Sequence, residues 1–448
     1  MKKYSSIALL GLIFVCPLNA QTLKEAVKYS LATEPDLAAT IHNKQAVEQE
    51  VFQAYSGYLP SFSIAVDYGN EKSSNSSTRA LTAAPVSLKK TSLGLTAAQS
   101  LFNGFSTYNS VQQSLYKAQS SAYGVQNSLE GSALNAITVY LDVLEKQKLV
   151  ALAEDNLKEH QELLSKIERR AQSGIGRYAD LDQAEGRFAL ARSNYLSQKA
   201  NLQDAKTYYQ RVIGITPQNL QIPLVDENKL PKTEESAVSV ALSEHPSIRS
   251  AMMSTSSASA AYRASFGAFL PSVSLQLVKR RDNNLGGVVG QTQSDAAVVS
   301  VNYTPFNGGS DKSKVIQLSE QWQSAKESRT LTMKKIEAQV RVSWNLAITA
   351  SQQAKYYADE VEAMIKTKDA YQKQFAIGQR TLVDLLGAED ELFRARTDLA
   401  STEFKKLKGQ YQLLGSMGSL LPALQLEVPP EAQYRDPGIL GAVVRSFF

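Results

Sequence analysis

Four stretches of the chain alternate apolar and polar residues with a period of two. The alternation is regular over 61–68, 272–277 and 297–304 and less regular around 91–101. Successive side chains of a strand point to opposite faces, so the pattern predicts four β-strands, each with one apolar and one polar face. Polar tips at 70–90 and 279–295 join the strands into two hairpins. The predicted apolar face contains Phe62, Ile64, Val66, Val273, Leu275, Val299 and Val301.

The remaining sequence predicts long helices. No proline occurs between Pro85 and Pro217 or between Pro305 and Pro422, and both stretches are rich in Ala, Leu, Gln, Glu, Lys and Ser. Residues 106–173 would form a helix about 100 Å long at 1.5 Å per residue. Apolar residues also repeat every seven positions along two seams, as at Leu181, Phe188 and Leu202. Two seams predict two helical neighbours, as in an extended helical tube or a coiled coil.

The chain is a tandem duplication. Leu59-Pro60-Ser61 matches Leu270-Pro271-Ser272 at an offset of 211, and Phe102-Asn103-Gly104 matches Phe306-Asn307-Gly308 at an offset of 204. Each copy has the order helix, two strands, long helix, glycine break and long helix. The predicted segments are a first repeat at 21–214, a linker at 215–232, a second repeat at 233–421 and a C-terminal extension at 422–448 with no counterpart in the first copy.

Residues 1–20 are predicted to be a signal peptide. Lys2 and Lys3 precede an apolar stretch from Ile7 to Val15, and Ala20 ends a plausible cleavage site. The only cysteine of the chain, Cys16, lies inside this segment, and the residue before it is not the small one that a lipid-attachment site prefers. The mature protein is therefore expected to be exported, to begin at Gln21 and to contain no disulfide.

Composition narrows the function classes. The formal net charge is +5, two of which belong to the predicted signal peptide, so nucleic acid is not an expected partner. After residue 20 no run of about 18 apolar residues is present, so a membrane role would require the strands. Known membrane barrels use at least about eight strands, so four cannot close one alone. The sequence thus predicts a mainly helical protein whose strands form part of a transmembrane β-barrel shared between copies.

No catalytic, metal or cofactor site is predicted. His42, His160 and His245 are far apart in sequence and have no metal-ligand spacing. The glycine pairs at 286–287 and 308–309 lack the context of a phosphate-binding loop. The chain is not expected to be an enzyme.

These features together resemble the TolC family of outer-membrane efflux and type I secretion channels. The resemblance covers 22–421 and is carried by the duplicated Leu-Pro-Ser, by Phe306-Asn307-Gly308-Gly309 and by the segment from Gly378 to Leu386. It implies a homotrimer in the outer membrane of a Gram-negative bacterium. Twelve strands would close one barrel, and a periplasmic α-helical barrel would continue it. It also implies an iris at the lower end, a periplasmic adaptor, and an inner-membrane ABC or proton-driven transporter as partners.

The resemblance places the iris on three residues. Asp384 matches the aspartate of the narrowest ring, and Gly387 stands where a second acid is usual. Arg380 matches the family's latch arginine, and Asp180 matches its acidic partner. Phe375 stands at the latch tyrosine and cannot donate a hydrogen bond. We therefore expect a weaker latch, softer cation selectivity, and mutual repulsion that raises the proton affinity of three copies of Asp384.

Simpler interpretations compete with these roles. An aspartate at a helix start interacts favourably with the helix dipole whatever its function, and an arginine can be a solvated surface charge. Two other classes of protein are also compatible with long helices: a periplasmic coiled-coil adaptor and a structural or adhesin stalk. The strand alternation and the duplication favour the channel. The exported substrate, protein or small molecule, is not indicated by the sequence.

Overall fold

The computed structural model describes residues 21–82, 84–174, 177–438 and 441. The predicted signal peptide at 1–20 and the end of the C-terminal extension lie outside the described residues. The chain forms two compact units, and each draws residues from both halves of the sequence. The first comprises Met1–Pro35, Leu129–Ala241 and Ala338–Leu426, and the second Asp36–Ser128, Leu242–Glu337 and Glu427–Phe448, as far as these are described.

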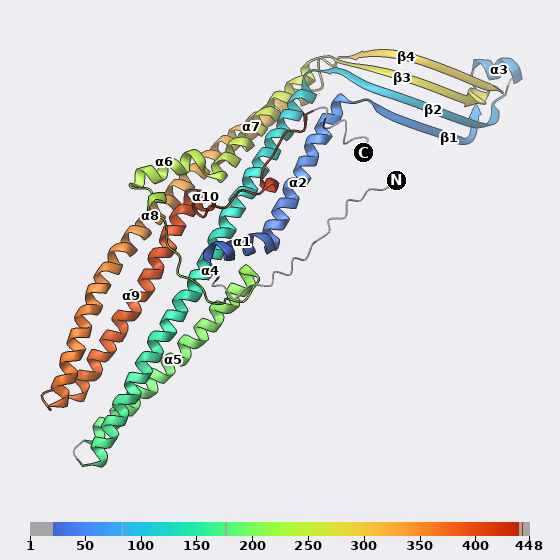
Figure 1. Ribbon diagram of the computed structural model, residues 1–448. Helices are drawn as coiled ribbons and strands as arrows, with labels where there is room; N and C mark the ends of the chain where they lie inside the picture. Colours follow the sequence, from blue (N-terminus) through green and yellow to red (C-terminus); the bar gives the residue numbers. More distant parts are fainter. Residues whose placement is uncertain (1–20, 83, 175–176, 439–440, 442–448) are drawn as a thin grey trace. The chain divides into compact units, whose positions relative to one another are not determined.

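Helices make up most of the described chain (Figure 1). The α-helices are α1 (Leu23–Thr33), α2 (Pro35–Tyr55), α3 (Ser76–Thr82), α4 (Ser106–Gln172), α5 (Tyr178–Ile213), α6 (Glu234–Glu244), α7 (Pro246–Ser265), α8 (Ser310–Ala376), α9 (Leu382–Ser416) and α10 (Leu420–Ala423). Short 3-10 turns lie at Ser56–Tyr58, Glu227–Lys229, Phe266–Phe269, Leu285–Gly287 and Pro430–Ala432. The strands are β1 (Ser61–Ser73), β2 (Val86–Asn103), β3 (Ser272–Asn283) and β4 (Gln291–Asn302).

The predicted long helices are confirmed. The helices α4 and α8 each run for 67 residues without a break. Each is followed by a glycine in the left-handed conformation, Gly174 with φ of 74° and Gly378 with φ of 76°. A residue with a Cβ atom is strained there, so glycine ends the helix and lets the chain turn into α5 or α9.

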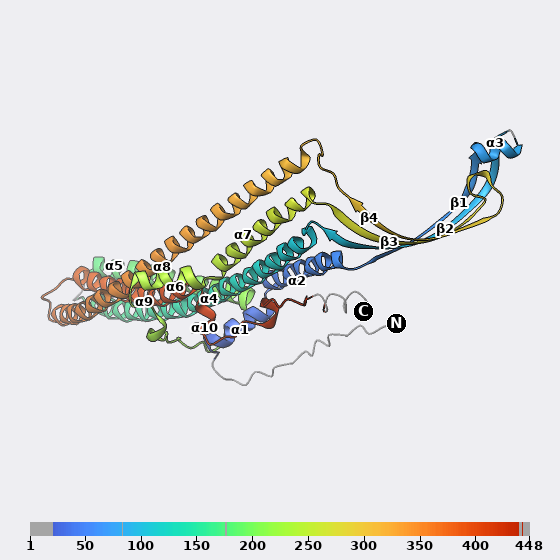
Figure 2. The same cartoon turned by 90° about the horizontal axis from the view of Figure 1, so that it is seen from above.

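The four strands form one antiparallel sheet in the order β1-β2-β3-β4 within the second unit. Figure 2 shows the strands curving together along their length. The strands are longer than the alternation predicts, because a backbone ladder continues wherever neighbouring strands pair, even among polar side chains. The predicted tips at 70–90 and 279–295 were therefore too long: pairing reaches Ser73 with Val86 and Asn283 with Gln291.

The first hairpin has an additional element at its tip. Helix α3 (Ser76–Thr82) is seven residues long and was not predicted. It lies in the connection at 74–85, which is five residues longer than the corresponding connection at 284–290 of the second copy, so it contains most of the seven extra residues of the first copy. The strand β2 also carries a pairing irregularity between Ser100 and Phe102.

The described part of the C-terminal extension packs within the second unit. Lys44 donates to the carbonyl of Gln433 at 2.8 Å, and the Tyr55 hydroxyl donates to Asp436 at 3.1 Å. Tyr434 packs against the core formed by Val51, Tyr55, Val111 and Leu115. The extension thus covers apolar side chains of α2 and α4 in this unit, a role that the sequence pattern did not reveal.

Candidate functional site

The turn between α8 and α9 and the start of α9 hold two of the three residues assigned to the iris, Arg380 and Asp384. Thr381 caps α9: its hydroxyl accepts from the backbone N–H of Asp384 at 3.3 Å, and the Asp384 carboxylate accepts from the backbone N–H of Thr381 at 3.1 Å. This reciprocal capping box fixes the start of the helix. The Asp384 side chain is therefore held in place by its own helix and remains partly exposed.

Arg380 lies directly beside this cap. Its guanidinium stands over the ring of Tyr371, with Cζ 4.3 Å from the ring centroid, and its Nε donates to Oε1 of Gln374 at 3.1 Å. A guanidinium nitrogen is 3.9 Å from a carboxylate oxygen of Asp384. The hydrogen bonds from Thr381 hold the pKa of Asp384 below its usual range, and the charge of Arg380 acts in the same direction. Within one chain the local effect is thus opposite to the mutual repulsion expected of three copies.

Asp180 does not join this group within the chain. The helix α5 begins at Tyr178, and its N-cap residue Arg177 makes no side-chain capping hydrogen bond. In the parts of the chain that the structure describes, no ion pair links Asp180 to Arg380. The predicted pairing of these two residues therefore stays a prediction for contacts between neighbouring chains.

Phe375 has a partner that the sequence analysis did not foresee. The guanidinium of Arg170, near the end of α4, lies 5.3 Å from the centroid of the Phe375 ring. A cation–π contact needs only the face of the ring, so the missing hydroxyl does not leave this position without an attraction. The contact joins the C-terminal end of α4, in the first repeat, to the C-terminal end of α8, in the second repeat.

An apolar cluster reinforces the same junction. Leu163 and Ile167 of α4 pack with Leu382, Leu385 and Leu386 of α9. Ala184 of α5 belongs to the cluster, and Tyr371 and Phe375 of α8 cover it. All four helices therefore contribute, and burial of these side chains stabilises the contact through the hydrophobic effect.

A group of ionisable side chains lies along the same helices, with His160 and Glu389 buried and the others partly exposed. Nδ1 of His160 is 4.0 Å from a carboxylate oxygen of Glu389, and its Nε2 is 4.0 Å from Asp390. Arg187 of α5 forms an ion pair with Asp390, and Lys368 of α8 forms one with Glu159 at 2.8 Å. Helices α4, α5, α8 and α9 each supply at least one member.

Burial shifts the titration of two members of this group. Only 7% of Glu389 is exposed, and one of its carboxylate oxygens has no hydrogen-bond partner. Burial raises the pKa of Glu389 to about 7. Burial also lowers the pKa of His160, although Asp390 opposes this effect. The interface between these helices therefore contains a carboxyl group whose charge changes near neutral pH.

This group was not predicted from the sequence, although one signal was present. Glu389 lies four residues after Leu385 and three before Leu392, so it occupies a position of the apolar seam of α9. A charged residue in such a seam indicates a buried partner. Its partner His160 is distant in sequence, and its spacing from the other histidines indicated only that it is not a metal ligand.

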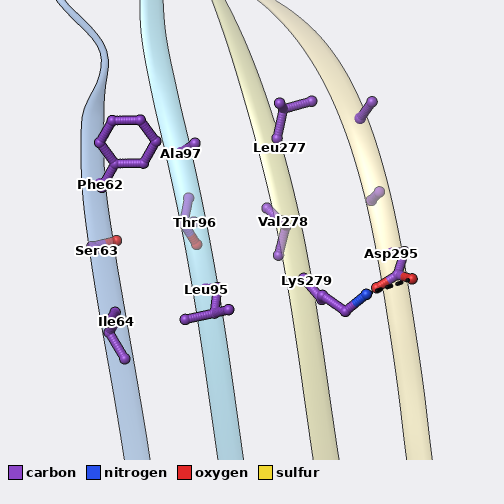
Figure 3. Close-up of a pocket in the computed structure, with 12 residues that line it drawn as sticks. Phe62, Ser63, Ile64, Leu95, Thr96, Ala97, Leu277, Val278, Lys279 and Asp295 are labelled. Atoms are coloured by element: carbon purple, nitrogen blue, oxygen red, sulfur yellow. Dashed lines mark hydrogen bonds and ion pairs between the residues drawn. The ribbon is translucent and has the colours of Figure 1, made fainter.

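The second candidate region is one face of the sheet. Strand register places Phe62, Ala97, Leu277 and Ala297 in one row across the four strands. The seven residues predicted for the apolar face all lie on this side, because each is an even number of positions away from the member of this row on its own strand. Figure 3 shows Phe62, Leu95 and Leu277 on the surface of the sheet. Several of these side chains are widely exposed, with Phe62 at 78%.

The opposite face is polar or small. It carries Ser61, Ser63, Ala65 and Asp67 on β1 and Ser300 on β4, with Val86, Leu88, Val278 and Val298 as apolar exceptions. The sheet is open: as far as the chain is described, β1 and β4 each pair with one strand and leave the other edge without a partner.

The described residues also bear on metal binding and on helical membrane spans. No group of three or more His, Cys, Asp or Glu that could hold a metal ion occurs among the described residues. Each helix in the described ranges is too short or too polar to cross a membrane.

Comparison with known families gives a match over most of the chain. The family described as outer membrane efflux protein matches residues 26–214 and 237–419. The outer membrane efflux protein BepC of Brucella suis biovar 1 (strain 1330) is 25% identical over 358 residues, which cover 80% of this chain and 78% of that protein. The outer membrane protein TolC of Escherichia coli (strain K12) is 22% identical over 418 residues, which cover 90% of this chain and 83% of TolC.

Solved structures share the fold. The CmeC outer membrane channel of Campylobacter jejuni superimposes with a TM-score of 0.79 at 16% identity, covering 89% of this chain and 86% of that one. The open state of the MtrE outer membrane channel of Neisseria gonorrhoeae gives a TM-score of 0.72 at 18% identity and covers 89% of each chain.

Proposed function

Because the chain belongs to the outer membrane efflux protein family, we propose that three copies of it form one exit duct for a tripartite export system. The protein is an outer-membrane channel subunit that extends into the periplasm. The proposal assigns it no catalytic reaction. Its partners would be a second and third copy of itself, a periplasmic adaptor, an inner-membrane ABC or proton-driven transporter, and the lipid of the outer membrane.

The open four-stranded sheet carries the proposal. It has one exposed apolar face and two edges, β1 and β4, that are long and unpaired among the described residues. Such edges invite pairing with another chain. Because the sheet has an even number of antiparallel strands, β4 of one copy would run antiparallel to β1 of the next. Three copies would close twelve strands with the apolar face toward lipid and the polar face toward water.

The helices of the first unit support the same assembly. In Figure 1, α4 and α9 lie between α8 and α5. The two outer helices expose large apolar side chains, with Val342 at 64% and Tyr356 at 72% on α8. Leu190, Leu196 and Tyr208 are likewise exposed on α5. Contact between α5 of one copy and α8 of the next would bury both sets and continue the duct below the membrane.

At the lower end of the duct, the turn before α9 would form the constriction. Three copies of Asp384 would line it, and Arg380 with Asp180 of a neighbouring copy would act as the latch. The contacts of Arg170 with Phe375 and of Leu163 with the α9 leucines would hold the two helical pairs of each copy together. Opening would then require movement between helices that these contacts join.

Assembly and conduction test the proposal together. The parent protein should resist extraction from outer-membrane fractions, migrate as a trimer in SDS without heating, and conduct ions in planar bilayers. Release as a soluble protein by osmotic shock, with no conductance, would favour a periplasmic adaptor or a stalk instead. Crosslinking in whole cells should capture a transporter: an ABC transporter would indicate protein secretion or ATP-driven efflux, and a proton-driven pump would indicate small-molecule efflux.

A further inference from the structure

We infer that the lipid-facing side of the sheet carries, beyond its apolar band, a binding surface for the phosphate groups of outer-leaflet lipid. Lys72, Lys89, Lys279 and Arg281 form it. The inference rests on the proposed function, because it takes the apolar face to be outward and the hairpin tips to lie on the far side of the membrane from the helices.

Strand register places all four cations on one face. Lys72 is ten residues from Phe62 on β1, and Lys89 pairs with Asn70, which is eight residues from Phe62. Lys279 pairs with Leu95, and Arg281 pairs with Leu93, both of which belong to the apolar face. All four side chains are exposed, so none of them packs in the core of the chain. Figure 3 shows Lys279 beside Asp295 on this face.

Charge differs sharply between the two faces of the same strands. Among the described strand residues, Asp295 is the one acid on the face of the four cations, 3.4 Å from Lys279. The opposite face carries three acids, Asp67, Glu71 and Asp282. Its two cations are paired there, Lys90 with Glu71 at 3.3 Å and Arg280 with Asp282 at 2.9 Å. The inward face is thus nearly balanced, whereas the outward face has a clear excess of positive charge.

The cations lie at one end of the apolar band. On β1 the apolar positions extend to Tyr68, but on β3 they stop at Leu277, and Arg281 is in the same row as Val66. The band therefore runs obliquely across the strands. Strands of a membrane barrel are tilted by about 35–45° from the axis, so positions at equal height shift by roughly one to two residues per strand. With this shift Lys279 and Arg281 fall level with positions of about 66 to 70 on β1, on either side of Tyr68, and Lys89 and Lys72 follow at positions of about 71 and 72, toward the hairpin tips.

A lipid satisfies both parts of this surface. Its acyl chains would lie on the apolar band, and its phosphate groups would reach the cations just beyond, where an aromatic residue such as Tyr68 is typical of the membrane interface. Arg281 can bind phosphate through two parallel hydrogen bonds, and the lysines act as mobile point charges. A lipid with two phosphate groups on a compact headgroup, such as lipid A, matches four cations spread over three strands.

Adjacent residues supply a matched test. The outward pair Lys89→Gln and Arg281→Gln removes two charges, and the inward pair Lys90→Gln and Arg280→Gln removes two charges from the neighbouring positions on the same strands. The assembled protein is purified with each pair of substitutions, incubated in micelles with diphosphoryl lipid A, and the retained lipid is counted by native mass spectrometry. We expect the outward pair to lower retention about tenfold and the inward pair to leave it within about twofold of the parent.

Two further measurements make the result decisive. Lipid A from which both phosphates have been removed should be retained equally by all variants, and the charge-preserving pair Lys89→Arg with Arg281→Lys should retain diphosphoryl lipid A like the parent. Equal loss from the inward and outward pairs, or no loss from either, overturns the inference. A parent that conducts as a trimer but shows this result refutes only the lipid surface, whereas a parent that neither assembles nor conducts refutes the proposed function itself.

Discussion

Helices α5 and α9 occupy the same place in the two repeats but have different surroundings. Leu382 at the start of α9 is 2% exposed, whereas its repeat equivalent Tyr178 at the start of α5 is 74% exposed. Glu389 is buried, and its equivalent Glu185 is exposed. The duplication thus preserved the helix and its heptads, but the position in the chain decides which copy is enclosed. The enclosed helix α9 contacts α4 and α8 of its own chain, whereas α5 leaves Leu190, Leu196 and Tyr208 exposed, the side chains that we propose to pack against a neighbouring copy.

The largest expected effect tests the enclosure of α9. Leu386→Ala removes a side chain that is 1% exposed in the apolar cluster, and such truncations cost about 2–5 kcal/mol. The equivalent substitution in the first repeat, Asp182→Ala, removes an exposed side chain and should change stability by less than about 0.5 kcal/mol. Hydrogen exchange of the α8–α9 turn measures the difference. Similar protection in both variants would mean that the cluster does not stabilise this end of α9.

In the sheet, unlike in the helices, the two repeats contribute equally, with two strands each. Val299→Arg places a charge on the predicted lipid face of β4 and should cost about 2–4 kcal/mol if it lies near the membrane midplane, whereas Ser300→Arg should cost much less. The amount of assembled trimer in the outer membrane reports the difference. Equal tolerance at the two positions would contradict the assignment of the faces.

Glu389 and Glu185 differ in their expected response to pH. Burial raises the pKa of Glu389 to about 7 from an ordinary value of 4.5, so the folded state binds more protons than the unfolded state between these values. The free energy of unfolding therefore contains a contribution that is present below pH 4.5 and is lost as the pH rises toward 7. Glu389→Gln cannot ionise and should exceed the parent in stability above pH 7 by on the order of 1–3 kcal/mol.

The control for this prediction is Glu185→Gln. Glu185 is exposed, so the variant should follow the parent at every pH. Thermal dissociation of the purified protein, measured from pH 4.5 to 8, separates the two outcomes. A parent and a Glu389→Gln variant with parallel pH profiles would show that the buried carboxyl group does not titrate in this range.

The capping residues predict a smaller difference between the two helix starts. Thr381→Ala removes the capping hydroxyl of α9 and should destabilise its first turn by about 1 kcal/mol. Arg177, at the corresponding position of α5, makes no capping hydrogen bond with its side chain, so Arg177→Ala should have little effect there. Hydrogen exchange of the first turns of α9 and α5 provides the measurement, and equal changes at both would remove the distinction.

The smallest energetic effect concerns the constriction, although the electrical effect is large. An exposed ion pair contributes only about 0–1 kcal/mol, so Arg380→Ser should leave the protein folded while raising single-channel conductance in planar bilayers. Asp384→Asn should reduce the preference for cations and the block by trivalent cations, since it removes three charges from the proposed ring. If both variants match the parent in conductance and selectivity, the constriction lies on other residues.

Much of the architecture could be predicted from the sequence because it depends on local rules. The absence of proline over more than a hundred residues and the glycines at 174 and 378 determine where the long helices run and end. Alternation was sufficient to predict one apolar face for each strand, since side chains along a strand alternate strictly. The register of the strands then placed Phe62, Val273 and Val299 on the same face of the sheet. The extent of the strands was underestimated because backbone pairing does not depend on side-chain polarity.

The contacts between distant segments were decided only by the tertiary structure. His160 and Glu389 are more than two hundred residues apart, and Arg170 meets Phe375 across a similar separation. Neither pair follows from spacing, because each depends on how two long helices are aligned along their length. Repeat symmetry alone would have treated Glu389 and Glu185 as equivalent. The sequence by itself determined the helices, the strands and their apolar faces through periodicity and backbone sterics, whereas burial, pKa and pairing required the packing of one helix against another, which no local pattern encodes.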